Sequence, residues 1–213
     1  SWVGWHHHQT LSLIDLDTFQ PAATVPVGKM PSGIAALPGG GFAVANAFSD
    51  SVSIVDQAAG QVSAELTGIA SVPSIAGANA GRLAVGVRSP PAVRFFLPGQ
   101  TAPGRTVELP SAPVAIEALS DDRFVVATES QLLVVHAVSG EVLHRAAFSA
   151  SSIAVLGTTI HAAGSGNASS FDETLRPSAP GLSPPAIAIE AAGGALFVAA
   201  PGIVRVHGAF TPS

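Results

Sequence analysis

The sequence contains no cysteine and no tyrosine, and it has only one lysine and two tryptophans among 213 residues. Without cysteine, disulfides, thiolate zinc sites, cysteine nucleophiles and covalent c-type haem attachment are excluded. The chain has 9 Lys and Arg against 14 Asp and Glu, and it has no basic run. The electrostatic attraction that drives nucleic-acid binding is therefore missing, and we expect no nucleic-acid partner. No apolar stretch of about 18 residues is free of Gly, Pro and charge, so the sequence predicts no membrane-spanning segment.

The residues that are abundant favour a folded protein made of short strands. Hydrophobic residues make up 47% of the chain and charged residues only 11%, which is enough apolar surface for a core. Gly (22) and Pro (17) are frequent, as expected of tight turns. Alanine favours helices, but Gly and Pro interrupt every candidate amphipathic helix. We therefore expect an all-β protein.

A repeat is the main signal in the sequence. One large apolar residue followed by Val, Ala or Gly recurs at intervals of 36 to 41 residues. The copies are WVGWH (2–6), FAVAN (42–46), LAVGV (83–87), FVVAT (124–128), IHAAG (160–164) and LFVAA (196–200). All of them except IHAAG are followed by a clear alternating strand, and the spacing of the copies is the size of a four-stranded propeller blade. The repeat predicts one β-propeller domain over residues 1–213, with six short blades favoured and five as the alternative. The expected blade units are residues 1–28, 29–68, 69–110, 111–148, 149–183 and 184–213.

The best copy of the repeat, residues 25–62, resembles one blade of the YVTN-type β-propellers, the family of quinoprotein amine dehydrogenase-like propellers. The matching positions are Val27-Gly28, Pro31, Gly33, Pro38, Gly40, Ala45-Asn46, the strand at 51–56 and Gly60. The match erodes after residue 70. In this family the motif specifies a scaffold and not an active site.

Three features of that motif have expected structural roles. We expect Gly39, Gly40 and Gly41 to supply positive φ angles in a tight turn. We expect Asn46 to bond backbone groups of the following turn, and Asp56 to form an Asx-turn.

Candidate binding residues follow from the propeller topology. The loops between second and third strands, and the connections between blades, open on one face around the central channel. Ligand sites usually lie there. The candidates on that face are His6, His7, His8, Lys29, Phe48, Asp50, Arg88, Glu129 and Asn167.

The three consecutive histidines are the only candidate metal ligands. His6 and His8 share a face in an extended segment and could chelate copper or zinc, but a convincing site needs further ligands. The other four histidines do not converge with them on any simple reading of the topology. The alternative is a solvated loop or a patch that contacts a partner. We expect no cofactor, with a divalent metal such as Cu or Zn as the alternative.

No catalytic residue is expected, because the nucleophile elbow, the HExxH motif and the phosphate loop are all missing. The nearest imitation of a propeller lyase site, in which His and Glu residues act in the channel, is His161 with Glu117 or Glu190. A hydrolase or lyase acting in the central channel is therefore kept as an alternative function.

The leading functional expectation is a non-catalytic propeller that binds other protein subunits as a scaffold in a larger assembly. The near absence of lysine, the absence of cysteine and the Ala, Gly and Pro content are common in exported proteins of high-GC bacteria. Because the chain begins at Ser1, we expect a mature periplasmic or extracellular product whose signal peptide has been removed. A further alternative is a metal- or redox-linked propeller, since propellers of related shape accompany cytochromes, amine dehydrogenases and copper enzymes.

Overall fold

The computed structural model describes residues 9–15, 17–69, 75–77, 81–164, 167–179, 188–192, 195–200 and 203–207. All regular structure in these ranges is β, in 21 strands that form six antiparallel sheets. In the part of the chain so described, no helix is long and apolar enough to cross a membrane.

The sheets follow one another along the chain. The first sheet holds β1 (Thr10–Ile14) and β2 (Pro21–Pro26), and the last holds β19 (Ala188–Ala192), β20 (Ala195–Ala200) and β21 (Ile203–His207). The four sheets between them have four strands each. These are β3 (Pro31–Leu37), β4 (Gly41–Asn46), β5 (Ser51–Asp56) and β6 (Gln61–Thr67); β7 (Ile75–Gly77), β8 (Leu83–Val87), β9 (Ala92–Phe96) and β10 (Arg105–Glu108); β11 (Pro113–Ala118), β12 (Arg123–Thr128), β13 (Gln131–His136) and β14 (Val142–Ala147); and β15 (Ser152–Leu156), β16 (Thr159–Gly164), β17 (Asn167–Phe171) and β18 (Pro177–Ala179).

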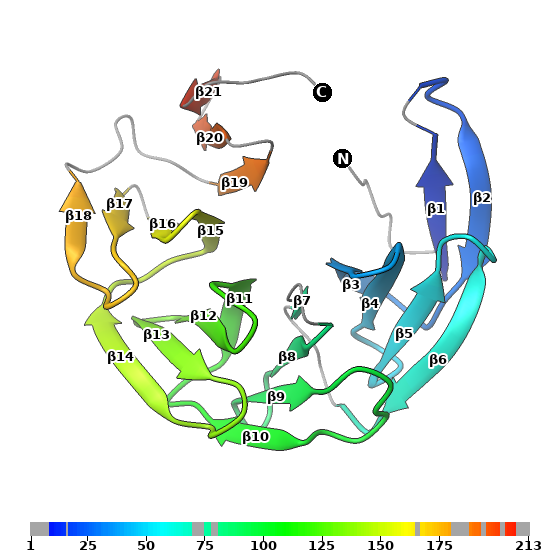
Figure 1. The fold of residues 1–213 in the computed structure, drawn as a ribbon, viewed down its shortest axis with the longest axis horizontal. Coiled ribbons are helices and arrows are strands. Elements are labelled where there is room, and N and C mark those ends of the chain that lie inside the picture. Colours follow the sequence, from blue (N-terminus) through cyan, green and yellow to red (C-terminus); the bar gives the residue numbers. More distant parts are fainter. Residues whose placement is uncertain are drawn as a thin grey trace.

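The sheets are arranged radially around a central space (Figure 1). The first strand of each four-stranded sheet lies innermost and the fourth lies at the rim. The described sheets trace an arc, with β1–β2 at one end and β19–β21 at the other (Figure 1). The all-β prediction and the β-propeller prediction are confirmed.

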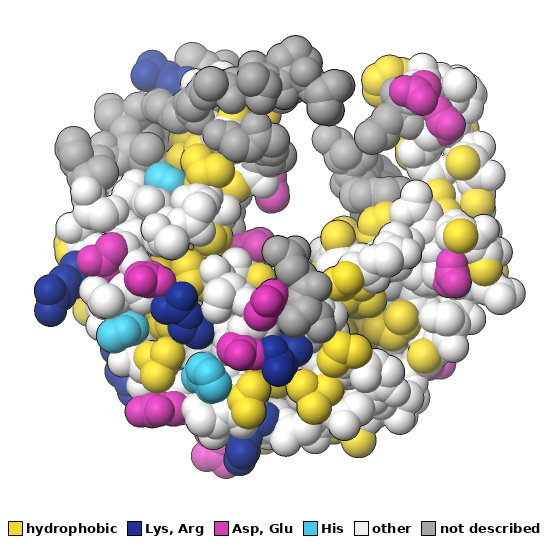
Figure 2. All heavy atoms as spheres, viewed as in Figure 1, with side chains coloured by type: hydrophobic (Ala, Val, Ile, Leu, Met, Phe, Trp, Pro, Cys, Tyr) yellow, Lys and Arg dark blue, Asp and Glu magenta, His cyan; other side chains and the backbone are white. Residues whose placement is uncertain are grey.

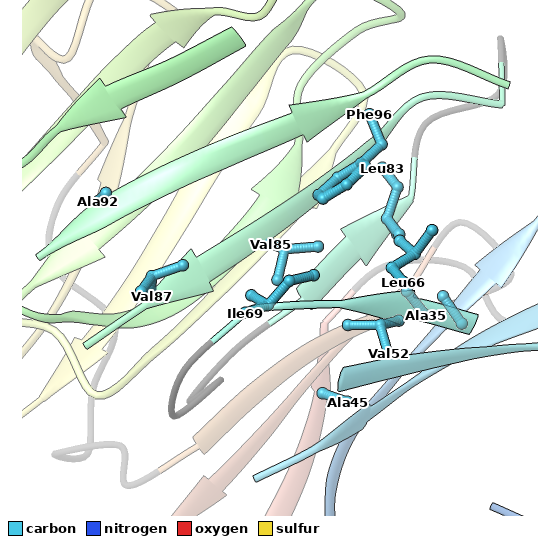
Figure 3. Packing of buried hydrophobic residues seen from close by; sticks show 11 residues of the cluster. Ala35, Ala45, Val52, Leu66, Ile69, Leu83, Val85, Val87, Ala92 and Phe96 are labelled. Atoms are coloured by element: carbon cyan, nitrogen blue, oxygen red, sulfur yellow. The ribbon is translucent and has the colours of Figure 1, made fainter. Parts of the chain in front are cut away.

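Apolar side chains fill the spaces between neighbouring sheets. Because successive side chains of a strand point to opposite faces, a sheet packed on both sides needs a continuous apolar run. All five residues of β8 are buried, as this requires. Figure 3 shows Val52 and Leu66 of one sheet against Val85 and Phe96 of the next. The outer strand β6 is mostly exposed, so burial falls from the centre to the rim.

The turn predictions are confirmed in part. Gly39 and Gly40 have φ angles of 82° and 83°, which the turn between β3 and β4 requires. Gly41 is outside the turn and begins β4, so its predicted positive φ is wrong. The backbone N–H of Ala59 donates to Asp56 Oδ1 at 3.0 Å, which confirms the predicted Asx-turn.

Polar contacts also join neighbouring sheets. Arg82, just before β8, pairs with Asp122 in the turn before β12. The next residue, Arg123, pairs with Glu173 beyond β17 at 2.9 Å. Two adjacent residues, one just before β12 and one at its start, therefore form ion pairs in opposite directions around the ring. Between β15 and β19, the Ser152 hydroxyl accepts from the backbone N–H of Ile189 and donates to its carbonyl, both at 3.1 Å.

Candidate binding face

Loops between second and third strands meet the connections between sheets on one face of the ring, as the sequence predicts. The N–H of Ile69, in the connection after β6, donates to the carbonyl of Asp50 at 2.9 Å. The N–H of Leu109, after β10, donates to the carbonyl of Pro91 at 3.0 Å in the same way. We call this side of the ring, which comprises residues 27–30, 47–50, 68–69, 88–91, 109–112 and 129–130, the loop face.

Two segments of the loop face hold Phe48 in a fixed position. The N–H groups of Ala47 and Phe48 donate to the carbonyls of Met30 and Lys29 at 2.9 and 3.1 Å. In return, the N–H of Lys29 donates to Ser49 Oγ. Because the backbone segments 29–30 and 47–49 are hydrogen-bonded to each other, the loop between β4 and β5 is held in place. The ring of Phe48 nevertheless remains 74% exposed. A large apolar side chain is thus presented to solvent on a rigid support.

Asn46 lies beneath this loop at the end of β4 and is completely buried. Its Nδ2 donates to Ser53 Oγ at 2.9 Å and to Ser51 Oγ at 3.2 Å. The prediction that Asn46 bonds backbone groups of the turn is therefore wrong, since its amide bonds two serine hydroxyls. A Cβ atom added to Gly28 would stand 2.7 Å from Asn46 Cγ, so only glycine allows this approach. The Val-Gly and Ala-Asn motifs of the sequence form one packing unit under the loop face.

The other candidate residues are spread around the loop face. Arg88 and Glu129 are exposed in the equivalent loops of the next two sheets, and Asn167 is exposed at the start of β17 in the third. Lys29 and Asp50 are exposed beside Phe48. The structure therefore brings Lys29, Phe48 and Asp50 together and leaves the other three on separate sheets. His6, His7 and His8 lie outside the described residues.

Metal ligands do not gather in the described part of the chain: no group of three or more His, Asp or Glu side chains there could hold an ion. His161 Nδ1 lies 2.9 Å from Ser170 Oγ, within the β15–β18 sheet.

Sequence reasoning missed one pair of carboxyl groups. Glu117 on β11 and Glu190 on β19 both belong to innermost strands, and Figure 2 shows acidic atoms in the wall of the central opening. Burial, and secondly the charge of Glu190, raise the pKa of Glu117 to about 7. The two carboxyl groups therefore interact although they are far apart in sequence. The shared tripeptide Ile-Glu-Ala, at 116–118 and 189–191, was the signal that could have found them.

Charged side chains are distributed unevenly over the ring. In the view of Figure 2, Arg, Asp, Glu and His side chains gather over the sheets β7–β10 and β11–β14, at the lower left. The ion pairs of Arg82 and Arg123 belong to this region. The loop-face segments defined above carry four charged residues, two of each sign: Lys29, Asp50, Arg88 and Glu129. This face has no net charge that would attract a strongly charged ligand.

Comparisons with known proteins identify the fold. No protein-family model matches the sequence, and no curated protein matches it. Among solved structures, a chain of a mitotic checkpoint complex matches with a TM-score of 0.81 at 14% identity, covering 96% of this chain and 69% of that one. The RRP9 WD40 repeats match with a TM-score of 0.76 at 15% identity, covering 93% and 69%. Hydrazine synthase of Kuenenia stuttgartiensis matches with a TM-score of 0.74 at 18% identity, covering 93% and 70%. At such identities the likeness shows the β-propeller fold alone, and the YVTN-type assignment stays a prediction.

Proposed function

We propose that this chain is a non-catalytic, exported propeller that binds other protein subunits through its loop face, as a scaffold within a larger assembly. The observation that carries the proposal is Phe48, an exposed aromatic ring on a loop that two backbone segments hold in place. A few aromatic or arginine anchors supply most of the binding energy at protein interfaces. An anchor that is already ordered loses little entropy when it binds.

The chemistry around Phe48 suits a protein partner. Lys29 and Asp50 are exposed in the same part of the loop face as Phe48 and carry opposite charges. Charged groups of either sign on a partner can therefore be matched at the rim of a contact. A fold does not by itself give a function. One structure with this fold is nevertheless a chain of a mitotic checkpoint complex by its title, which supports an assembly role. The proposed export is supported by the composition, with one lysine and no cysteine.

Replacing Phe48 by serine tests the proposal. We expect recovery of partner subunits, captured with the tagged protein from its native source and quantified by mass spectrometry, to fall about tenfold or more. The chain offers a matched control in Phe19, whose ring is 75% exposed in the loop at the other end of β2. The Phe19→Ser variant is expected to recover the same subunits at the wild-type level.

Unfolding curves of both variants should coincide with that of the wild type, because neither side chain is buried. Equal recovery of partner subunits by Phe48→Ser and the wild type would contradict binding through the loop face. Equal losses in both variants would also contradict it, since the effect would then not depend on the face.

A further inference from the structure

Two of the turns that join a third strand to a fourth strand have the same construction. One follows β5 and the other follows β13. In the first turn, the N–H of Gly60 donates to the carbonyl of Asp56 at 2.9 Å, and Gly60 has a φ angle of 61°. In the second turn, the N–H of Gly140 donates to the carbonyl of His136 at 2.8 Å, and Gly140 has a φ angle of 76°. The second turn therefore repeats the first, with a histidine at the place of an aspartate.

The histidine side chain also takes the role of the aspartate side chain. Asp56 Oδ1 accepts from the backbone N–H of Ala59, three residues later, at 3.0 Å. His136 Nδ1 accepts from the backbone N–H of Ser139, again three residues later, at 3.1 Å. A backbone N–H can only donate, so Nδ1 carries no proton and the proton of the neutral ring is on Nε2. The geometry therefore defines both the charge state and the tautomer of His136.

A second donor converges on the same ring nitrogen. Ser139 Oγ lies 3.1 Å from His136 Nδ1 and accepts from the backbone N–H of Glu141 at 3.2 Å, so its hydroxyl proton can be donated to Nδ1. A protonated Nδ1 is itself a donor, and it would face the N–H of Ser139 with no acceptor between them. The carboxylate of Asp56 has no such conflict, because a typical aspartate stays ionised above about pH 4. The turn at His136 is therefore sensitive to a proton in a range where the turn at Asp56 is not.

The turn at His136 is also a contact between two sheets. Arg105, at the start of β10, donates through Nε to the carbonyl of Val138 at 3.3 Å. A Cβ atom added to Gly140 would stand 2.8 Å from Cδ of Arg105, so the turn lies directly on the side chain of this arginine. Both contacts come from the short segment that the hydrogen bond to His136 Nδ1 closes. A change at Nδ1 therefore acts on the contact between β10 and the sheet β11–β14.

Charges of both signs lie on the described elements packed around this turn. Arg123 is the cross-strand neighbour of His136 on β12, and it pairs with Glu173 of the following sheet. Asp122, which precedes β12, pairs with Arg82 of the preceding sheet. The positive groups are Arg82, Arg105 and Arg123, and the negative groups are Asp122, Glu141 and Glu173. Neither sign dominates, so the response of the turn to a proton depends on the donors that face Nδ1.

We propose that His136 is a pH-sensitive switch, in which uptake of a proton at Nδ1 breaks the hydrogen bond from the N–H of Ser139 and releases the turn from β10. The released turn binds one proton more than the closed turn, so a fall in pH shifts the equilibrium toward the released form. Histidine side chains exchange this proton between about pH 5 and 8. Release moves Val138, which is already 50% exposed, away from Arg105.

Amide hydrogen exchange of Ser139, followed by NMR between about pH 7.5 and 5.5, tests the switch. In the wild type we expect the protection factor, taken against the intrinsic exchange rate at each pH, to fall about tenfold or more as the pH is lowered. His136→Asp restores the carboxylate acceptor found at Asp56, and its Ser139 protection is expected to stay constant. His144→Gln is the matched control, since it removes an imidazole from the neighbouring strand β14 and should show the same fall as the wild type.

Constant protection of Ser139 in the wild type would overturn the proposal. An equal fall in His136→Asp would also overturn it, because the effect of acid would then not pass through the imidazole. The Ala59 amide is an internal reference in the same spectra, and its protection should not change, because its acceptor is the carboxylate of Asp56.

The ring nitrogens of His136 give a second readout that needs only the wild-type protein. Nitrogen-15 NMR at about pH 7.5 should show a proton on Nε2 and none on Nδ1. The opposite tautomer would overturn the proposal, because Nδ1 could then not accept from Ser139. Because this readout requires no substitution, it decides the proposal even where a variant fails to fold.

Discussion

Replacing Glu117 by glutamine is expected to stabilise the fold above neutral pH and to leave its stability unchanged near pH 4. Burial and the nearby charge of Glu190 raise the pKa of Glu117 from 4.5 to about 7. Below pH 4.5 the carboxyl group is protonated in both the folded and the unfolded chain, and pH has no effect through it. Between pH 4.5 and 7 the unfolded chain has lost the proton that the folded chain still holds. Stability therefore falls as pH rises through this window and is lowest above it.

The size of the effect follows from the shift in pKa. A shift of this size corresponds to at most about 3 kcal/mol, and partial exposure of the side chain reduces the figure. The neutral amide of glutamine escapes the cost of burying a charge. At pH 8 we expect the variant to melt up to roughly 6 to 12 °C above the wild type.

Thermal unfolding between pH 4 and 8 is the measurement. Glu129→Gln, which changes an exposed glutamate of the loop face, is the matched control and should follow the wild-type curve at every pH. If the melting temperatures of the wild type and of Glu117→Gln instead change in parallel between pH 4 and 8, the burial of the Glu117 carboxylate is not what limits stability.

Replacing Gly164 by alanine is expected to destabilise the protein by about 2–3 kcal/mol. Gly164 ends β16, and an added Cβ would stand 2.5 Å from the carbonyl oxygen of Ser149 and 2.9 Å from the Cα of Ala150. Both are backbone atoms of the connection from the preceding sheet, so no side chain can rotate away to make room. The connection itself has to move, and the apolar contacts of β15 move with it.

Gly104→Ala is the matched control for this prediction. The nearest atom to an added Cβ at Gly104 is 3.5 Å away, an ordinary contact, and its φ is outside the left-handed region. Removing glycine from such a position restricts the unfolded chain and stabilises by about 0.4–1 kcal/mol. Urea unfolding should therefore move in opposite directions for the two variants. A Gly164→Ala midpoint at or above that of the wild type would show that the close approach at the end of β16 is not tight.

Gly164 and Gly28 each allow the end of a second strand to lie close to the connection that enters its sheet. At the end of β4 the strand carries the large residue, Asn46, and the incoming connection carries the glycine. At the end of β16 the strand carries the glycine, and the connection brings Ser149 and Ala150. The shared requirement is close approach, and this explains how the Asn signature of the repeat is lost at the end of β16 without loss of the fold.

The sequence was sufficient to predict local structure and the repeat. The alternating run at 51–56 and the short apolar run at 83–87 became β5 and β8, because period and turn residues act over short distances. The strand at 167–171 was nearly invisible in the sequence, because Asn-Ala-Ser-Ser-Phe has weak strand propensity. There the pairing with β16 and the burial of Ala168 and Phe171 decide the structure.

The candidate site was predictable only in its position on a face. Topology placed Lys29 and Phe48 on the same side of the ring, but the hydrogen bonds that tie their backbones together depend on a connection that crosses from one sheet to the next. The interaction of Glu117 with Glu190 depends on the curvature of the ring, which no local pattern encodes. The hydrogen-bond partners of Asn46 were also predicted wrongly, because Ser51 and Ser53 face it only once β4 and β5 are paired.

The position of Asp122 and Arg123 at the start of β12 has a consequence for how the ring unfolds. Asp122 forms an ion pair with Arg82 of the preceding sheet, and Arg123 forms one with Glu173 of the following sheet. Three successive sheets are therefore linked at this point. Among the described residues, the last sheet packs on its neighbour through a hydrophobic cluster that has fewer buried residues than the clusters between the three linked sheets. The hydroxyl of Ser152 adds a hydrogen bond. In a stack of units held by nearest-neighbour contacts, the weakest seam opens first. We therefore expect the three sheets joined by these ion pairs to unfold as one cooperative block, and β19–β21 to detach before that block unfolds.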